Sequence, residues 1–209
     1  MIVTTRVIDL RTRENEAKLR AALGFEVVRA EQVHGPLVVP VSEALPTVPG
    51  ADGLATRSKL ALMALGADCP GVAIVGEESV AVAHSGWRGA VSDIAPNAVA
   101  ALVAWGEKAS ELRAFVGPGI GVCCFEVGDE VVAAFEQAHG PMGSLVRRPR
   151  KAHIDLKGAI ARRLVEKAGL RPENVVVAPE CTKCASETFF SRRREGPGCG
   201  HHAVIAHLR

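Results

Sequence analysis

A thiol and an imidazole stand at the two ends of a short predicted hairpin. Two apolar runs, Gly71–Val75 and residues 80–83, flank a Gly-Glu-Glu-Ser turn, a pattern typical of antiparallel strands. Cys69 precedes the first run, and His84 follows the second. Because the start of one antiparallel strand lies beside the end of the next, the sequence predicts that Cys69 and His84 are neighbours. Such a pair is typical of either a metal site or a Cys/His nucleophile pair.

A third residue, His34, could complete a metal site with this pair. Catalytic Zn²⁺ usually takes three protein ligands from His, Cys and carboxylates, which leaves a fourth position for water or substrate. The spacing of His34, Cys69 and His84 is not a compact ligand signature, so the fold must bring them together. Each also has a plainer interpretation: a turn histidine, a small buried hydrophobe and a histidine at a strand end. Spacing alone leaves both interpretations open.

The composition indicates one globular domain of 209 residues, 48% of them hydrophobic, with no visible linker. A net charge of +2 does not favour binding to nucleic acid or to a membrane surface. The apolar runs are too short to span a membrane, and the first residues lack the apolar core of a secretory signal. We therefore expect a cytoplasmic protein whose six cysteines stay reduced.

Strands and helices that must position these residues can be read along the chain. Helical periodicity and end signals predict four helices: 12–24, 92–105, 129–139 and 155–169. Apolar runs outside the hairpin predict seven strands: 2–5, 26–33, 37–41, 60–65, 112–116, 174–178 and 203–208. Because the two kinds of element alternate without a strict βαβ rhythm, the order favours a mixed α/β sandwich over a Rossmann sheet.

Six short motifs occur together along the chain. They are Gln32-Val33-His34-Gly35, Ala51-Asp52-Gly53, Ala67-Asp68-Cys69-Pro70, His84-Ser85-Gly86-Trp87-Arg88-Gly89, Gly117-Pro118-Gly119-Ile120-Gly121 with Phe125-Glu126-Val127-Gly128, and Phe189-Phe190-Ser191-Arg192-Arg193. In this order and spacing they resemble the YfiH-like family of laccase-domain, or polyphenol-oxidase, proteins. Members of that family have been assigned purine nucleoside phosphorylase and adenosine deaminase activity, and one branch is called peptidoglycan editing factor. The resemblance implies a single-domain, four-layer α/β/β/α sandwich over residues 1–209.

The resemblance also implies a zinc site and two reactions. The family's zinc ligands fall on His34, Cys69 and His84. The implied reactions are phosphorolysis of adenosine, inosine and guanosine to base and ribose 1-phosphate, and removal of the adenine amino group by water. Zinc suits the second reaction because it lowers the pKa of bound water to about 7. Copper is less expected, since multicopper centres need clustered histidines and the seven here are scattered.

Three further residues are candidates for a role in substrate binding or catalysis beside the metal. Phosphorolysis needs cations near phosphate, and Arg88 and Arg192 could supply them, although either could be an ordinary surface charge. Asp68 could orient a ligand or act as a base, but it could equally cap the nearby turn.

The N-terminal loop that helps to close the substrate cleft in most members of the family looks shortened in this sequence. This difference puts the substrate specificity, and the activity itself, in question.

Two other functions fit the same residues. Without a metal, Cys69 could be the nucleophile of a hydrolase with His84 as its base, which would suit editing of a peptidoglycan precursor. The shortened N-terminus would also fit a metal-binding protein that has lost catalysis. The metal content of the purified protein separates the metal-free hydrolase from the other two readings.

The remaining cysteines raise a separate question. Two Cys-rich stretches near the C-terminus could form a second, structural zinc site with the following ligands: Cys181, Cys184, Cys199 and His201. The plainer interpretation is a sheet end with chance thiols. Cys123 and Cys124 lie between apolar Val122 and Phe125, so we expect them to be packing residues.

Overall fold

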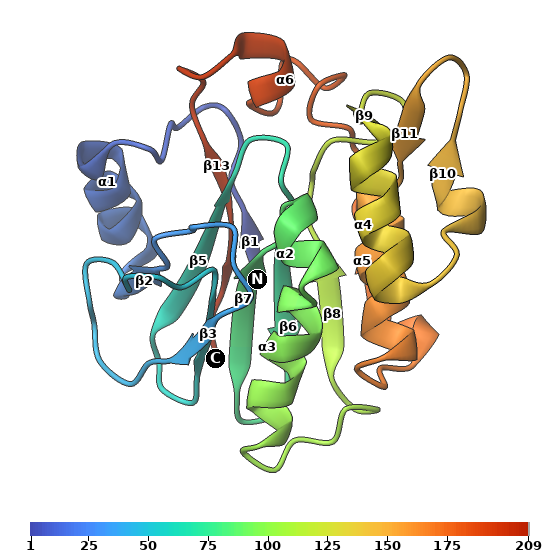
Figure 1. Ribbon diagram of the computed structural model, residues 1–209. Coiled ribbons are helices and arrows are strands. Elements are labelled where there is room, and N and C mark those ends of the chain that lie inside the picture. The colour runs from blue at the N-terminus through green and yellow to red at the C-terminus, as the bar shows by residue number, and fades with distance from the viewer. Residues whose placement is uncertain (209) are drawn as a thin grey trace.

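Two β-sheets lie face to face, with helices on the outer face of each (Figure 1). This computed structural model describes residues 1–208. The larger sheet has the strand order β12-β8-β6-β7-β4-β3, and the smaller one has the order β1-β13-β5-β2. Strand β5 packs across β7, and β13 packs across β6 and β7. The predicted mixed α/β sandwich, with layers in the order α/β/β/α, is therefore confirmed.

The strands of both sheets are short and pair in parallel and antiparallel directions. In the larger sheet they are β3 (Val38–Pro40), β4 (Gly53–Thr56), β6 (Gly71–Val75), β7 (Val80–His84), β8 (Arg113–Val116) and β12 (Val175–Val177). In the smaller sheet they are β1 (Ile2–Val3), β2 (Val27–Arg29), β5 (Ala61–Gly66) and β13 (His202–Ala206). A third, antiparallel sheet contains β9 (Glu126–Val127), β10 (Val146–Arg147) and β11 (Ala152–Ile154).

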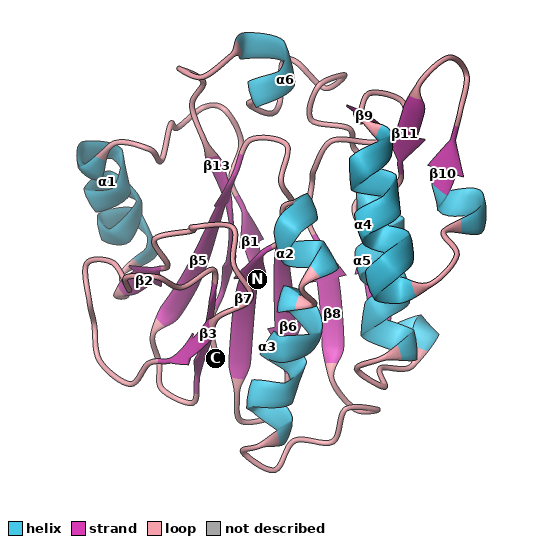
Figure 2. Ribbon diagram, in the orientation of Figure 1, coloured by secondary structure: helices cyan, strands magenta, loops and turns pink. Residues whose placement is uncertain are grey.

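The helices form the two outer layers, which Figure 2 shows in cyan around the magenta strands. They are α1 (Arg13–Leu23), α2 (Trp87–Val91), α3 (Ile94–Val103), α4 (Asp129–His139), α5 (Leu156–Glu166) and α6 (Arg192–Glu195), with short 3₁₀ turns at Gly143–Leu145 and Pro172–Asn174. Helix α1 covers the smaller sheet, whereas α3 and α5 pack on the larger one. Short α6 lies above the loop between β5 and β6 (Figure 1). No helix in residues 1–208 has the length and apolarity needed to cross a membrane.

Alternation along β5 and β13 separates two of the hydrophobic clusters. In β5, Leu62 and Ala64 face the larger sheet, whereas Met63 and Leu65 pack toward α1. Strand β13 alternates in the same way, and all five of its residues are buried. Because side chains point to opposite faces with a period of two, a strand covered on both faces is apolar throughout. This is why the interior strands read as continuous apolar runs in the sequence.

Helix end signals predicted most helix positions correctly. The Thr12 side chain accepts from the Asn15 amide at 3.3 Å, and Gly24 ends α1 with a φ of 72°. Asp155 caps α5 in the same way. Residues 92–105 contain α3, and Pro96 lies in its first turn, as the sequence predicts.

Two features differ from the expectation. Residues 53–56, where no strand was predicted, form the buried strand β4 between β3 and β7. The predicted strand 26–33 ends at Arg29, because the chain leaves the sheet and reaches positive φ at Gln32 (68°) and His34 (66°). This last departure places His34 at the candidate site.

Candidate functional site

The hairpin of β6 and β7 brings Cys69 and His84 together, as predicted. Gly71 pairs with His84, and the Ser85 amide donates to the Pro70 carbonyl at 3.0 Å. One ligand atom from each of His34, Cys69 and His84 lies within 4.8 Å of the others. We call these three residues the His-Cys-His group. Residues that are distant along the sequence therefore form one set of donor atoms.

Asp52 holds both histidines of this group. Its Oδ1 accepts from the His34 amide at 2.9 Å and contacts His84 Nδ1 at 2.9 Å. Its Oδ2 accepts from the Gly35 amide at 2.7 Å. Because Nδ1 is engaged with the carboxylate, Nε2 is the ring nitrogen of His84 that is available to a ligand. A histidine oriented by a carboxylate in this way is typical of metal sites in proteins.

The loop that carries His34 is attached to the end of β5. The Gln32 side chain donates to the Leu65 carbonyl at 2.9 Å and accepts from the Leu65 amide at 2.8 Å. Both Gln32 and His34 have positive φ, a conformation that non-glycine residues adopt rarely and that surrounding contacts must support. The two hydrogen bonds from Gln32 and those to Asp52 supply that support. They place the exposed imidazole of His34 beside the buried one of His84.

The donor set of the His-Cys-His group suits a metal ion. Two imidazoles and one thiol are a donor set that zinc accepts, with a further position left for water or substrate. The ring centres of His34 and His84 lie 4.8 Å apart, and the ring planes form an angle of 83°. Gly86 leaves room for the group: a Cβ at this position would lie 2.9 Å from Cys69 Sγ and 3.2 Å from His34 Cδ2. A larger residue would therefore press on two of the three donors.

Electrostatics in the metal-free protein favour a thiolate beside an imidazolium. Burial alone would raise the pKa of Cys69, but hydrogen bonds and charge from His34 and His84 lower this pKa to about 6. Burial alone would lower the pKa of His84, but hydrogen bonds to Asp52 and Cys69 raise it to about 9. At neutral pH the pair is therefore an ion pair. A thiolate is the form of cysteine that binds metals and attacks electrophiles.

A cavity of about 570 Å³ opens onto the His-Cys-His group, and its rim is basic. Arg11, Arg29, Arg192 and His201 line it together with the three donor residues, and Glu31 is the acidic residue among its lining. Arg192 is an exposed residue that donates to the Pro197 carbonyl at 3.3 Å, and Arg11 donates to the Gly198 carbonyl at 2.7 Å. The cavity thus combines a set of metal donors with several cations.

Two predicted site residues, Arg88 and Asp68, do not line the cavity. Arg88 is exposed, its guanidinium lies 4.3 Å from the centre of the Trp87 ring, and it is not among the residues that line the cavity. We therefore do not retain it as a phosphate ligand. Asp68 is buried, and its two oxygens accept from Thr182 Oγ1 and from the Arg193 amide, each at 2.7 Å. This favours the orienting role for Asp68 over that of a base, because both oxygens are already engaged.

Sequence reasoning did not identify Asp52, Arg11, Arg29 or His201 as residues of this site. Asp52 belongs to the Ala51-Asp52-Gly53 motif, but its position in the sequence does not indicate that it contacts His84, 32 residues away. The two arginines look like surface charges in the sequence. His201 was grouped with the C-terminal cysteines, whereas it lines the cavity.

Comparison with known proteins identifies the family. The family described as "Multi-copper polyphenol oxidoreductase laccase" matches residues 8–209. A purine nucleoside phosphorylase of Deinococcus radiodurans is 36% identical over 93% of this chain and 76% of its own length. Adenosine deaminase RL5, from an unknown prokaryotic organism, is 39% identical over 77% of this chain, and the match spans 63% of that deaminase.

Solved structures agree with this assignment. The hypothetical protein YfiH of Bacillus licheniformis superposes with a TM-score of 0.87 and 26% identity, covering 94% of this chain and 80% of that one. YlmD from Geobacillus stearothermophilus gives a TM-score of 0.85 and 30% identity, covering 93% of this chain and 79% of that one. The chain therefore belongs to the YfiH-like, laccase-domain family, as the six motifs predicted.

Proposed function

We propose that this chain is a zinc-dependent purine nucleoside enzyme. It would cleave adenosine, inosine and guanosine with phosphate to give the free base and ribose 1-phosphate, and it would also deaminate adenosine. The observation that carries this proposal is the cavity that joins the His-Cys-His group to a basic rim. Its volume of about 570 Å³ lies within the usual range of small-molecule sites. The names of the relatives, purine nucleoside phosphorylase and adenosine deaminase, support the same conclusion.

Each residue has a definite role in this proposal. His34, Cys69 and His84 would hold the zinc ion, which would act as a Lewis acid when bound. Asp52 would keep Nδ1 of His84 engaged, so that the ring cannot turn away from the cavity. Asp68 acts as a positioning residue for the segment that precedes Cys69.

The basic rim would bind the phosphate. Arg192 is the preferred candidate, and Arg11 and Arg29 line the same cavity. In phosphorolysis a phosphate oxygen forms a bond to C1′ while the bond from C1′ to the base nitrogen breaks, and the base leaves with the electron pair and takes up a proton. A guanidinium provides parallel donors that can align the attacking phosphate. Adenosine deamination uses water in place of phosphate and so does not need this contact.

The reaction can be tested with inosine and the purified protein. We expect hypoxanthine and ribose 1-phosphate to appear only when phosphate is present, with the sugar phosphate followed by phosphorus NMR. With adenosine and no phosphate, we expect slow formation of inosine. Release of hypoxanthine at the same rate without phosphate would refute phosphorolysis, and loss of neither activity after complete zinc removal would refute the metal dependence.

A second candidate function rests on the ion pair in the metal-free group. The lowered pKa of Cys69 and the raised pKa of His84 are those of an activated cysteine nucleophile, as a hydrolase acting on a peptidoglycan precursor would need. This function requires protein that is active without bound metal. Zinc analysis together with inactivation by iodoacetamide discriminates between the two, because bound zinc would protect Cys69 from alkylation.

A further inference from the structure

Four cysteines converge at a second place, away from the cavity. Within residues 1–208, one ligand atom from each of these residues lies within 4.8 Å of the other three: Cys123, Cys124, Cys181 and Cys184. We call them the four-cysteine cluster. Cys199, which the sequence grouped with Cys181 and Cys184, is instead buried against Ala67 and Phe190. The predicted second ligand set is therefore wrong in two of its four members.

The expected packing role of the two adjacent cysteines also needs correction. Cys124 packs partly against the large core, but Cys123 is exposed. A thiol placed only to fill space would be buried among apolar side chains. Instead, both sulfurs lie near that of Cys184, at 3.8 Å from Cys123 Sγ and 3.5 Å from Cys124 Sγ. The thiols face one another.

These separations match those around one tetrahedral ion. With Zn–S bonds of about 2.3 Å, the edge between two sulfurs of a tetrahedron is about 3.8 Å. The two sulfur separations from Cys184, 3.5 and 3.8 Å, lie at or slightly below this value, and every pair lies within 4.8 Å. A disulfide would bring two sulfurs to about 2.05 Å and leave the other two outside the bond. Here all six cysteines of the chain are free, and four of them share one small volume.

The backbone holds the two halves of the cluster together. Gly119 and Cys181 form a parallel bridge, and the Thr182 amide donates to the Gly119 carbonyl at 3.1 Å. The Cys181 carbonyl accepts from the amides of Cys184 and Ala185, which closes the turn between the two ligands of this half. These bonds fix the backbone of Cys181 and Cys184 beside Gly119 without any bond between sulfurs.

Gly121 lies against both halves of the cluster. A Cβ on this residue would lie 3.0 Å from Cys181 Cβ and 3.3 Å from Cys123 Sγ. The Cys124 amide donates to the Gly121 carbonyl at 2.9 Å, so the glycine also shapes the turn that presents the two adjacent cysteines. A side chain here would push the two pairs of sulfurs apart.

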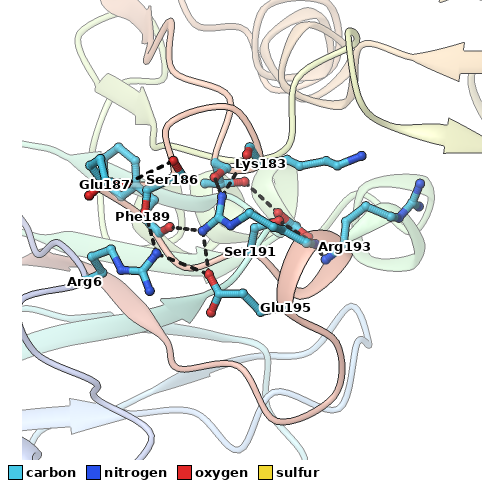
Figure 3. A network of polar contacts seen from close by, with 11 residues as sticks. Arg6, Lys183, Ser186, Glu187, Phe189, Ser191, Arg193 and Glu195 are labelled. Atoms are coloured by element: carbon cyan, nitrogen blue, oxygen red, sulfur yellow. Dashed lines mark hydrogen bonds and ion pairs between the residues drawn. The ribbon is translucent and has the colours of Figure 1, made fainter.

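Arg194 fixes the loop that carries Cys181 and Cys184. It donates to the carbonyls of Thr182 and Lys183, at 2.8 Å each, and to that of Phe189 at 2.7 Å. Figure 3 shows this network, in which Lys183 and Phe189 lie around the same centre and Glu195 joins it to Arg6. The loop is thus held in one conformation without any help from the sulfurs. Preorganised ligands lose less conformational entropy when a metal binds.

Two cations bind backbone carbonyls of segments that adjoin the cluster. The ammonium of buried Lys157 donates to the carbonyls of Ala178 and Glu180, just before Cys181. The Arg193 guanidinium donates to the Glu126 carbonyl at 3.0 Å, just after Cys124. Buried charges are tolerated when they have partners of opposite sign. Asp155 and Glu180 supply charge of opposite sign to the Lys157 ammonium, and thiolates of the cluster would add to it.

We propose that the four-cysteine cluster binds a structural zinc ion through four thiolates. Four sulfur ligands with no open position are typical of structural zinc, in contrast to the three ligands of the His-Cys-His group. The ion would join the turn after the Gly-rich segment 117–121 to the loop 181–185, which are brought together by no other covalent or metal link in the described residues. This site is independent of the proposed nucleoside chemistry.

The test counts zinc in the whole chain, purified without chelator. We expect about two zinc ions per wild-type chain and about one in Cys184→Ser, because serine is a poor zinc ligand. Cys199→Ser is the matched control, since it alters a buried cysteine outside the cluster, and it should keep both ions. Cys69→Ala should lose only the other ion. X-ray absorption of the wild type should then give about 2.5 sulfur ligands per zinc.

Several results would overturn the proposal. Cys184→Ser protein that keeps both ions would exclude this residue as a ligand. One zinc per wild-type chain, with a non-reduced mass lower by two hydrogens, would show a disulfide in place of the metal. Iron with acid-labile sulfide would show an iron–sulfur cluster instead. If Cys184→Ser fails to fold, the sulfur count of the wild type decides alone: about one sulfur per zinc would refute the second site.

Discussion

Replacing Asp52 by Asn tests whether this carboxylate holds the metal site together. Three donors share its two oxygens: the His34 amide and His84 Nδ1 on Oδ1, and the Gly35 amide on Oδ2. An asparagine has one oxygen and one NH₂ group, and the NH₂ group can only donate. If the oxygen stays with the histidines, the new NH₂ group faces the Gly35 amide. The substitution therefore removes at least one hydrogen bond and leaves a donor without an acceptor.

The size of the effect follows from these contacts. Asp52 is 1% exposed, so the unpaired donor cannot turn to water, and we expect a loss of about 1–3 kcal/mol of folding free energy. The charge that orients and polarises His84 also disappears. Changes to a carboxylate behind a metal-bound histidine typically weaken metal affinity by about 10–100-fold. We expect zinc binding at the His-Cys-His group to weaken by that factor.

Zinc affinity is measured by competition with a chromophoric chelator, and folding free energy by urea unfolding of the same samples. The matched control is Asp93→Asn, which alters another buried carboxylate that accepts from Arg163 and Lys167 and does not line the cavity. It should lose stability and keep its zinc affinity. An Asp52→Asn protein with wild-type zinc affinity and turnover would show that Asp52 only supports the fold.

Three further predictions concern separate parts of the molecule. In metal-free protein, the rate at which Cys69 reacts with iodoacetamide should be half-maximal near pH 6 and should decrease at lower pH, since the thiolate is protonated as the pH drops through its pKa of about 6. A midpoint near pH 9 would refute the ion pair. Arg192→Lys should raise the phosphate concentration for half-maximal phosphorolysis by about tenfold and leave the rate of deamination unchanged. Arg88→Lys should change neither reaction. Equal losses of both reactions in Arg192→Lys would show that Arg192 supports the fold. Asp93→Ala should cost about 3 kcal/mol in urea unfolding, because it leaves the cations that face it unpaired; a change below about 0.5 kcal/mol would refute this.

Much of the fold could be predicted because its signals are local. Helix α4 has the predicted bounds, since Gly128 and Gly140 flank an amphipathic run that turns one apolar face inward. Strand β4 was missed because Gly53 and Asp52 are typical of loops. In the structure Gly53 is required by crowding, since a Cβ there would lie 2.7 Å from the Val38 side chain. Burial between two neighbouring strands, which no local pattern reveals, outweighs the low strand propensity of this segment.

The candidate sites also differ in whether a local sequence pattern could predict them. Cys69 and His84 could be paired from the sequence because one hairpin carries both, and hairpin geometry is local. The sulfurs of Cys123 and Cys184 meet across 61 residues, and their pairing depends on how the Gly-rich loop packs against the end of the sheet. Cys199 is closer in sequence to Cys184 than Cys123 is, yet it packs elsewhere. Ligand spacing identifies a zinc site only when the ligands lie on one short motif.

Asp68 connects the His-Cys-His group and the four-cysteine cluster through its backbone and side chain. Its φ of 94° is unfavourable for a residue with a side chain and persists only where contacts impose it. Those contacts are the bonds from Thr182, between Cys181 and Cys184, and from the Arg193 amide, together with the Ile120 amide that donates to the Asp68 carbonyl. All three partners lie on segments that border the four-cysteine cluster, while the next residue along the chain is Cys69. The segments that carry the cluster therefore also hold the residue that precedes Cys69, even though the two groups share no ligand.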